Sequence, residues 1–190
     1  MSGRLHAHTG EGWDGVLMPG EQILWQGRPD AAFEFGMAQV ATALFGLFFA
    51  GFATVWMLLA STGGGYFWTF GLIHFSVGIA MAIGAFVYAP WRRRHTWYTL
   101  TNRRAFIATD LPFAGRKLRS WPIDADTGIS HDGGDPATVH FAQEFIQTKN
   151  GTRTVPIGFE RISDGEEVHR MMADIRDRRR AAETKMETQQ

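Results

Sequence analysis

Five basic side chains lie between residues 103 and 119, on segments that we expect to be the first strands of a sheet and their turns. They are Arg103, Arg104, Arg116, Lys117 and Arg119. Guanidinium and ammonium groups donate hydrogen bonds to phosphate and carboxylate oxygens, so a cluster of them could bind an anionic lipid headgroup, another phosphate or an acidic protein partner. The alternative is a solvated strand edge kept basic against aggregation. A peptide could also add to an exposed sheet edge, which needs no special residues.

A second polar cluster combines imidazole and carboxylate groups, which could ligate a metal ion or act as general acid and base. Its members are His131, Asp132, Asp135, His140 and Glu144. Gly133-Gly134 and Pro136 interrupt the cluster, and this composition is typical of a loop. We therefore interpret these side chains as solvated turn residues.

Motifs of several common enzyme classes are missing: the sequence contains no G-x-S-x-G, P-loop or H-E-x-x-H pattern. Cysteine is absent, which excludes disulfides, thiolate metal sites and cysteine nucleophiles. The 19 basic and 19 acidic residues cancel, so no net charge favours nucleic acid. We expect a protein that is not an enzyme, with no catalytic residues, cofactor, metal or nucleic-acid partner. A small-molecule ligand stays open.

The longest uncharged stretch determines the class of the protein. Residues 35–91 contain no Asp, Glu, Lys or Arg. Two apolar runs within it, Met37 to Ala60 and Tyr66 to Tyr88, each exceed the ~20 residues that a helix needs to cross a bilayer. We expect a transmembrane helical hairpin with helices over residues 35–60 and 66–91 and a periplasmic turn over residues 61–65.

The basic residues after the second span predict its orientation. Arg92, Arg93 and Arg94 follow Trp91 at once, whereas the turn at residues 61–65 has no basic residue. By the positive-inside rule both termini are cytoplasmic. Aromatic side chains near the span ends are typical of a membrane interface, and these are Trp56, Trp68, Tyr88 and Trp91.

Small residues recur every seven positions in both spans and predict a packing seam between the two helices. They are Gly36, Ala43 and Ala50 in the first span and Gly71, Gly78 and Ala85 in the second. His74 is the one ionisable group well inside a span, which makes it a functional candidate. Without an acidic partner in either span, we expect one backbone or hydroxyl partner for it rather than a proton relay.

The segments before the hairpin differ in character. Residues 1–15 predict a flexible tail, and a metal site at His6 and His8 is an alternative that we do not favour. Residues 16–34 predict a cytoplasmic strand segment with a short strand over residues 22–26. A strand this short is not stable alone, so we expect it to pair with the sheet that follows the hairpin.

Residues 96–180 predict a cytoplasmic domain of short strands and one helix. We expect strands over residues 96–100, 104–109, 117–123, 137–142, 145–149 and 153–159, loops over 124–127 and 130–136, and a brief strand at Ile129. Pro122 makes the third of these an edge or bulged strand, and Asn150-Gly151 signals a hairpin turn.

The final helix has the clearest signals of the domain. Ser163-Asp-Gly-Glu166 fits a capping box, and an apolar stripe over Val168, Met171, Met172 and Ile175 follows with helical spacing. Arg178-Arg179-Arg180 suits the negative end of the helix dipole. We expect the stripe to pack on the sheet and residues 181–190 to form a disordered tail.

Three motifs resemble the bacterial pleckstrin-homology-like membrane proteins: Pro19-Gly-Glu-Gln-Ile-Leu-Trp-Gln-Gly-Arg-Pro29, Tyr98-Thr-Leu-Thr-Asn-Arg-Arg104 and Ile157-Gly-Phe-Glu-Arg-Ile-Ser-Asp164. The likeness covers nearly the whole chain beyond residue 15. It implies an α+β membrane protein of the bacterial inner membrane, in which a two-helix anchor carries a half-open β-barrel plugged by the last helix. It also implies a binding or assembly role without catalysis.

Two further comparisons bear on function. The Gly-Glu-x-Ile-Leu-Trp-Gln-Gly-x-Pro stretch is similar to the opening of purple-bacterial photosynthetic-complex assembly proteins, which implies an assembly role. A likeness to the aspartate carbamoyltransferase catalytic subunit carries no chemistry over, because its Ser-Thr-Arg-Thr phosphate loop and His-Pro-x-Gln element are absent. Thr152-Arg153-Thr154 is expected on a hairpin rather than at a helix start, where phosphate would bind.

The function that we predict is non-enzymatic: a domain held at the cytoplasmic leaflet of a lipid bilayer binds a protein partner, scaffolds or assembles a membrane complex, or associates with copies of itself. The alternative is a sensor of anionic lipid headgroups that uses the basic strand-turn residues. An enzyme is the remote alternative.

Overall fold

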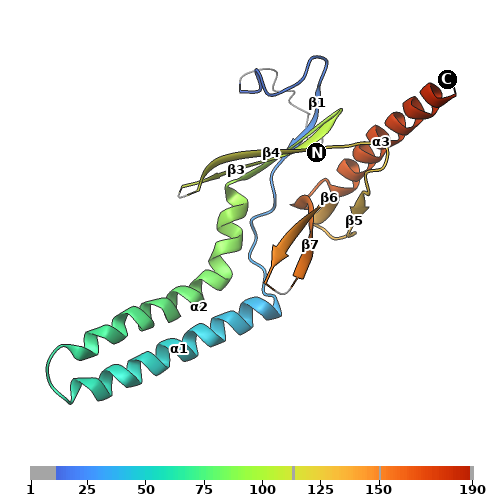
Figure 1. Ribbon diagram of the computed structural model, residues 1–190. Helices are drawn as coiled ribbons and strands as arrows, with labels where there is room; N and C mark the ends of the chain where they lie inside the picture. Colours follow the sequence, from blue (N-terminus) through green and yellow to red (C-terminus); the bar gives the residue numbers. More distant parts are fainter. Residues whose placement is uncertain (1–11, 113, 150, 189–190) are drawn as a thin grey trace, which may run out of the picture. The chain divides into compact units, whose positions relative to one another are not determined.

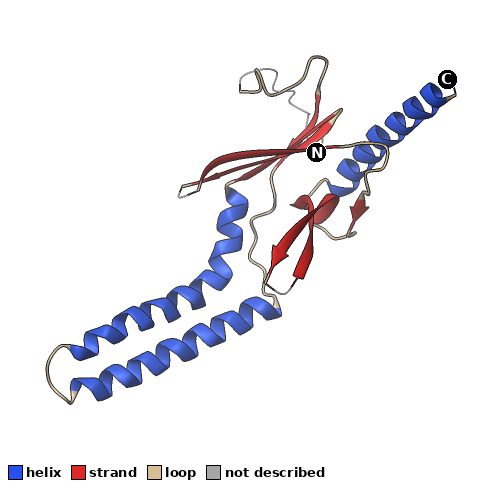
Figure 2. Cartoon of the chain, in the orientation of Figure 1, coloured by secondary structure: helices blue, strands red, loops and turns tan. Residues whose placement is uncertain are grey.

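The structure, a computed structural model, describes residues 12–112, 114–149 and 151–188, so His6, His8 and Asn150 lie outside the described residues. The chain is α+β and divides into two compact units (Figures 1 and 2). We call Ala31–Arg93 the hairpin unit and the remainder the β domain. The elements in chain order are β1 (Ile23–Gly27), α1 (Met37–Ser61), the 3₁₀ helix η1 (Phe67–Phe70), α2 (Gly71–Arg94), β2 (Thr96–Thr101), β3 (Arg104–Leu111), β4 (Gly115–Pro122), β5 (Ser130–His131), β6 (Ala137–Thr148), β7 (Gly151–Ile162) and α3 (Gly165–Glu187).

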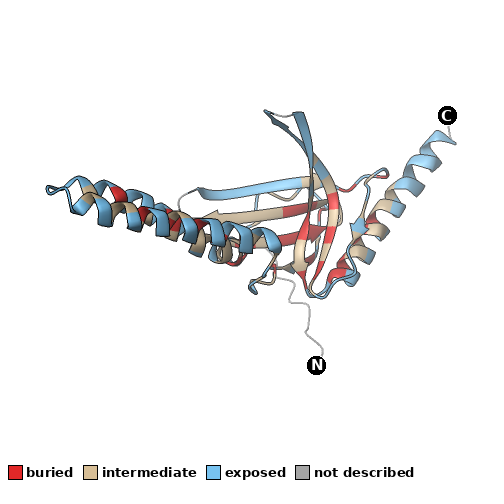
Figure 3. Cartoon of the chain, turned by 90° about the horizontal axis from the view of Figure 1, so that it is seen from below, coloured by how far each residue is buried: buried red, intermediate tan, exposed pale blue. Residues whose placement is uncertain are grey.

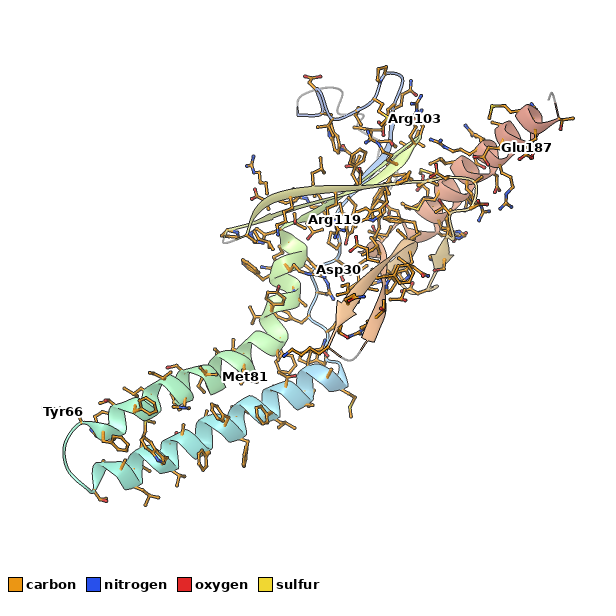
Figure 4. All side chains as sticks on the ribbon, in the orientation of Figure 1. Asp30, Tyr66, Met81, Arg103, Arg119 and Glu187 are labelled. Carbon is orange, nitrogen blue, oxygen red and sulfur yellow. The ribbon has the colours of Figure 1, made fainter. Side chains whose placement is uncertain are left out.

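In the hairpin unit, α1 and α2 run side by side in opposite directions, joined by a turn that ends at Tyr66 (Figures 1 and 4). The small-residue seam consists of buried residues on both helices: Ala43, Gly46, Ala50, Ala53, Gly71 and Gly78. A Cβ added to Gly46 would lie 2.6 Å from the carbonyl oxygen of Gly78, so the backbones touch there. Four of these six residues belong to the predicted stripes. Gly36 precedes α1 instead of packing within it.

Both helices are long and apolar enough to span a membrane. Only 22% of the most apolar stretch of Met37–Ser61 and 11% of that of Phe67–Arg94 is buried, whereas the core helix of a soluble protein would be mostly buried. Figure 3 shows the exposed colour along both helices. Large apolar side chains such as Phe48, Phe52 and Leu59 face outward, 72%, 63% and 68% exposed.

α2 continues beyond the predicted end of the second span. It runs through Pro90 to Arg94, so Arg92 and Arg93 are helical rather than the start of a loop. Pro90 lacks an N–H and crowds the carbonyl four residues earlier, which bends a helix without necessarily ending it. Cations in a last helical turn also interact favourably with the helix dipole.

The β domain contains two antiparallel sheets, one with the order β1-β2-β3-β4 and the other with the order β5-β6-β7. β1 pairs with β2, with Trp25 opposite Leu100 and Gly27 opposite Tyr98. The prediction that the strand before the hairpin joins the sheet after it is therefore confirmed. β4, which contains Pro122, lies at a sheet edge as expected.

The second sheet corrects three strand boundaries. β6 is one strand where two were predicted, because register shifts near Val139 and Ala142 change the alternation without ending the strand. β5 occupies Ser130 and His131, which were predicted as loop, while Ile129 lies outside it. β7 runs from Gly151 to Ile162, beyond the predicted 153–159.

Aromatic rings form the centre of the β-domain core. Tyr98 and Trp25 both stack on Phe159, with ring centroids 4.7 Å and 5.5 Å away, and Phe141 meets the same ring edge-on at 5.0 Å. Burying one such side chain contributes about 2 to 3 kcal/mol. The core therefore needs β1 as well as the strands after the hairpin.

α3 packs on the second sheet through Val168, Met172 and Ile175, as the apolar stripe predicts. The predicted capping box is wrong: the N-cap is Asp164, with no side-chain capping bond. Its carboxylate instead accepts a hydrogen bond from Trp25 Nε1 at 3.3 Å. The disordered tail predicted from residue 181 is also wrong for the described part, because the helix continues to Glu187.

Candidate functional site

The five predicted binding residues do not form one face. Residues two apart on a strand share a face, so Arg116 lies on one face of β4 and Lys117 and Arg119 lie on the other. Register places Arg116 opposite Asp110 and Arg119 opposite Ile107. Arg103 lies in the turn between β2 and β3, well away from Arg119 (Figure 4).

Arg104 is a structural residue. Its Nη2 lies 2.6 Å from Glu21 Oε2 and its Nε lies 3.1 Å from Glu21 Oε1, while Nη2 also donates to the Val16 carbonyl at 3.1 Å. The guanidinium stacks over Phe106, 4.8 Å from the ring centroid. The Glu21 side chain is fully buried. The guanidinium group of Arg104 is thus bound to Glu21 and Val16 in the segment before β1.

The charge state of Glu21 follows from these contacts. Burial by itself would raise its pKa, but hydrogen bonds from the Arg104 side chain, the Met18 N–H and the Thr101 hydroxyl outweigh burial and lower the pKa from 4.5 to about 2. The same ion pair raises the pKa of Arg104. Both groups are therefore charged near neutral pH.

Arg119 forms a surface ion pair with Glu144 and stacks over Trp121, 4.8 Å from the ring centroid. Glu144 belongs to the second polar cluster predicted from the sequence, so this contact separates it from His131 and Asp132. Three of the five predicted binding residues are thus paired with carboxylates of the protein itself: Arg104 with Glu21, Arg119 with Glu144, and Arg116 with Asp110.

A groove of about 720 Å³ lies on the face of the first sheet that points away from the core. We call it the sheet groove. Every strand of the sheet contributes: Gln26 from β1, Trp97 and Thr99 from β2, Ala108 and Asp110 from β3, and Arg116 and Leu118 from β4, with Trp13 and Arg28 beside them. Its surface is aromatic and apolar with a few charged groups.

The charges of the sheet groove favour an anion. Arg28 lies over Trp97 with its guanidinium carbon 4.8 Å from the ring centroid. Arg116 pairs with Asp110 at 2.9 Å, and both side chains are exposed. Within the ranges that the structure describes, Arg28 forms no ion pair, whereas the side chain of Lys117 belongs to the opposite face of β4. One cation thus remains uncompensated over an aromatic ring, and guanidinium groups bind carboxylates and phosphates strongly.

Sequence reasoning identified Arg116 and missed Arg28, Trp97 and Trp13. Arg28 lies before the hairpin and reaches the groove only because β1 pairs with β2. Gln26 and Arg28 are two residues apart, as are Trp97 and Thr99, and residues two apart on a strand share a face. This spacing could have predicted that Arg28 lies on the same face of the sheet as Trp97.

The histidine and aspartate cluster is a turn. Asp132 Oδ1 accepts hydrogen bonds from the N–H groups of Thr138 at 2.8 Å and Gly134 at 3.2 Å. The Thr138 bond, followed by the Gly134 bond, lowers the pKa of Asp132. His131 lies beside His169, with ring centroids 5.7 Å apart. Among the described residues, no group of three or more histidine and carboxylate side chains could hold a metal ion.

The basic residues at the end of α2 differ in exposure. Arg93 is buried, pairs with Glu34 and donates to the Ala32 carbonyl at 3.2 Å, whereas Arg92 and Arg94 are exposed. Glu34, which we expected at the membrane interface in reach of water, thus neutralises one of the three arginines. Trp91 packs near Tyr88, with ring centroids 6.3 Å apart.

Comparison with known proteins identifies no family for this chain. No protein-family model matches the chain, and searches of curated proteins and of solved structures find no match. The pleckstrin-homology-like barrel therefore stays a prediction from the sequence motifs.

Proposed function

We propose that this chain is a non-enzymatic bacterial inner-membrane protein whose hairpin unit lies in the bilayer and whose β domain binds an acidic segment of a protein partner in the sheet groove. The observation that carries the proposal is the groove, where Arg28 lies over Trp97 and has no carboxylate partner among the described residues.

The exposed apolar surface of α1 and α2 supports membrane insertion. A soluble monomer rarely exposes a contiguous apolar patch larger than a few hundred Å², and here both helices are apolar all round outside the seam. Hydrocarbon solvates such a surface, and the helices satisfy their own backbone hydrogen bonds. The exposed Arg92 and Arg94 favour placing the β domain on the cytoplasmic side.

The groove supports an extended acidic segment as the ligand. Trp97, Ala108 and Leu118 offer apolar contact, while Arg28 offers a cation. β4 forms one border of the groove and is also the edge of its sheet, so the backbone of an extended peptide could pair with it. A segment that alternates acidic and apolar residues would match this surface.

The membrane part of the proposal is tested by single-cysteine labelling in bacterial cells. The chain has no native cysteine, so Thr62→Cys in the turn and Thr184→Cys on α3 each report one site. We expect an impermeant maleimide to label position 62 in intact cells and position 184 only after lysis. Labelling of both positions in intact cells, or release of the protein by carbonate, would contradict insertion with this orientation.

The groove is tested by titrating the full chain, in phosphatidylcholine nanodiscs, with a peptide of alternating Glu and Val while tryptophan fluorescence is recorded. We expect Arg28→Gln to weaken binding by about fivefold to tenfold, the loss of one charge-assisted hydrogen bond. Arg170→Gln removes the same charge from the exposed surface of α3 and should leave binding unchanged.

The same titration with a water-soluble short-chain phosphatidylglycerol separates the two ligand classes. If the lipid binds in a manner that depends on Arg28 while the peptide does not bind, a headgroup sensor replaces the protein-binding module. If neither ligand responds to Arg28→Gln, the sheet groove is not the binding site.

A further inference from the structure

A second cavity lies within the hairpin unit, with a volume of about 250 Å³. We call it the histidine cavity. Its lining is almost entirely aromatic and apolar: Phe49, Phe52, Ala53 and Trp56 of α1, Phe70 of η1, and Gly71 and His74 of α2. The imidazole of His74 lies between two phenyl rings, with centroids 5.3 Å from Phe70 and 6.0 Å from Phe49.

The contacts of His74 fix which nitrogen carries the proton. Nδ1 lies 3.3 Å from the Phe70 carbonyl oxygen. A carbonyl oxygen only accepts hydrogen bonds, so Nδ1 carries the hydrogen in this contact. In the neutral ring Nε2 is then an acceptor with a free lone pair. Among the residues described, no group donates a hydrogen bond to Nε2.

An unsatisfied Nε2 acceptor is unfavourable in the hydrocarbon of a bilayer. An unsatisfied polar group in an apolar medium costs several kcal/mol, and neither lipid tails nor the aromatic lining can donate a hydrogen bond to it. Trp56 has an indole N–H, but no hydrogen bond joins it to His74 among the residues described. His74 is exposed on the surface of α2, so a donor from outside the chain can reach Nε2.

We propose that the histidine cavity binds the head of a membrane-dissolved quinol, a flat, uncharged ring with a hydroxyl group that donates to His74 Nε2. The proposal rests on the membrane insertion of the hairpin unit. A single substituted ring is of the size that the cavity can hold, and Phe49, Phe52 and Trp56 offer faces on which it would stack. Residues 35–91 contain no carboxylate or cation, so a charged ligand would find no counter-charge within the helices.

The quinol would bind by donating a hydrogen bond from its hydroxyl group to His74 Nε2. A ligand that lacks only this hydroxyl hydrogen is therefore the matched control. The purified full chain in nanodiscs is titrated anaerobically with decyl hydroquinone and with its dimethyl ether, which keeps the ring and loses both hydroxyl hydrogens. The fluorescence of Trp56, isolated by comparison with Trp56→Phe, reports occupancy. We expect the hydroquinone to bind at least about tenfold more tightly than the ether, the effect of one hydrogen bond in an apolar site.

The variant His74→Phe keeps an aromatic ring and removes the acceptor, so it should bind both ligands with the weak affinity of the ether. Ser76→Ala, an exposed position of the same helix that does not line the cavity, should bind like the unmodified chain. In a ¹⁵N-histidine spectrum, His74 should show the Nδ1–H tautomer, with an Nε2 shift when hydroquinone is added.

Three results would overturn the proposal: equal binding of the hydroquinone and its ether, undiminished hydroquinone binding by His74→Phe, or tighter binding of a zinc porphyrin than of the hydroquinone in a His74-dependent manner. The last result would assign His74 as a metal ligand for a tetrapyrrole. Failure of membrane insertion would be recognised separately, since the chain would then remain soluble without nanodiscs or detergent.

Discussion

Glu21 and Arg104 form a buried ion pair, with Glu21 Oε2 2.6 Å from Arg104 Nη2, although the whole helical hairpin separates them in the sequence. The Thr101 hydroxyl donates to the same carboxylate at 2.6 Å. The pair ties the segment before β1 to the start of β3. The β domain is therefore one folding unit made of two distant parts of the chain.

The first prediction concerns which fragments fold. Residues 96–188 alone lack Glu21, Trp25 and the whole of β1, so we expect them to remain largely unfolded. A fusion of residues 12–30 to residues 94–188 through a flexible Gly/Ser linker restores the ion pair and the Trp25–Phe159 stack. We expect this fusion to be soluble and to unfold cooperatively, as measured by circular dichroism during heating. A cooperatively folded 96–188 fragment would contradict the argument.

The second prediction is a pH dependence of the fusion's stability. The folded pKa of Glu21 is about 2 and its ordinary value is 4.5, so the unfolded state binds the proton more readily. The stabilisation is fully present above pH 4.5 and is lost as the pH falls toward 2. The shift corresponds to about 3 kcal/mol. Urea unfolding at pH 6 and at pH 3 should show about 2 kcal/mol of this loss, because pH 3 is still above the folded pKa.

Glu21→Gln isolates this carboxylate. The variant leaves Arg104 without its counter-charge, so we expect a loss of about 3 kcal/mol at pH 6 and a smaller further loss at pH 3 than in the parent. Glu166→Gln, which changes an exposed carboxylate of α3, should lose less than about 0.5 kcal/mol and keep the pH dependence of the parent. Equal pH dependence in the parent and in Glu21→Gln would assign the effect to other groups.

Sequence periodicity predicted much of this fold because burial dictates it locally. The apolar stretch from Phe35 to Trp91 yields two long apolar helices, and Val168, Met172 and Ile175 form the buried stripe of α3. Features set by tertiary contacts were missed. Asp164 makes no side-chain capping bond to α3, and its carboxylate accepts hydrogen bonds from Ser163 and from Trp25, which is far away in the sequence.

The candidate site was predicted only in part for the same reason. Charge alone cannot distinguish Arg104, which a buried glutamate holds, from Lys117, which has no ion-pair partner within the described ranges. Likewise, Arg28 contributes to the groove through a strand pairing that spans the hairpin. Nearby basic residues in a sequence therefore indicate a binding surface only after strand register has assigned each one to a face.

The last prediction concerns the close packing of α1 against α2. A side chain at Gly46 would collide with the backbone of α2, since even a Cβ would lie 2.6 Å from the Gly78 oxygen and 2.7 Å from the Ala82 nitrogen. Gly51 lies on the same helix, and a Cβ there would meet nothing within 4 Å. We expect Gly46→Ile to destabilise the hairpin by about 1 to 3 kcal/mol or more through overpacking, and Gly51→Ile to have little effect.

Cysteine pairs give the measurement, because the chain has no cysteine of its own. Val55→Cys and Ser76→Cys, exposed positions on α1 and α2, accept spin labels, and the distance distribution between the labels should broaden in Gly46→Ile and stay unchanged in Gly51→Ile. If both variants keep the narrow distribution, the close approach at Gly46 and Gly78 does not hold the hairpin together. If both broaden it, the cause is the added side chain itself rather than its collision with α2.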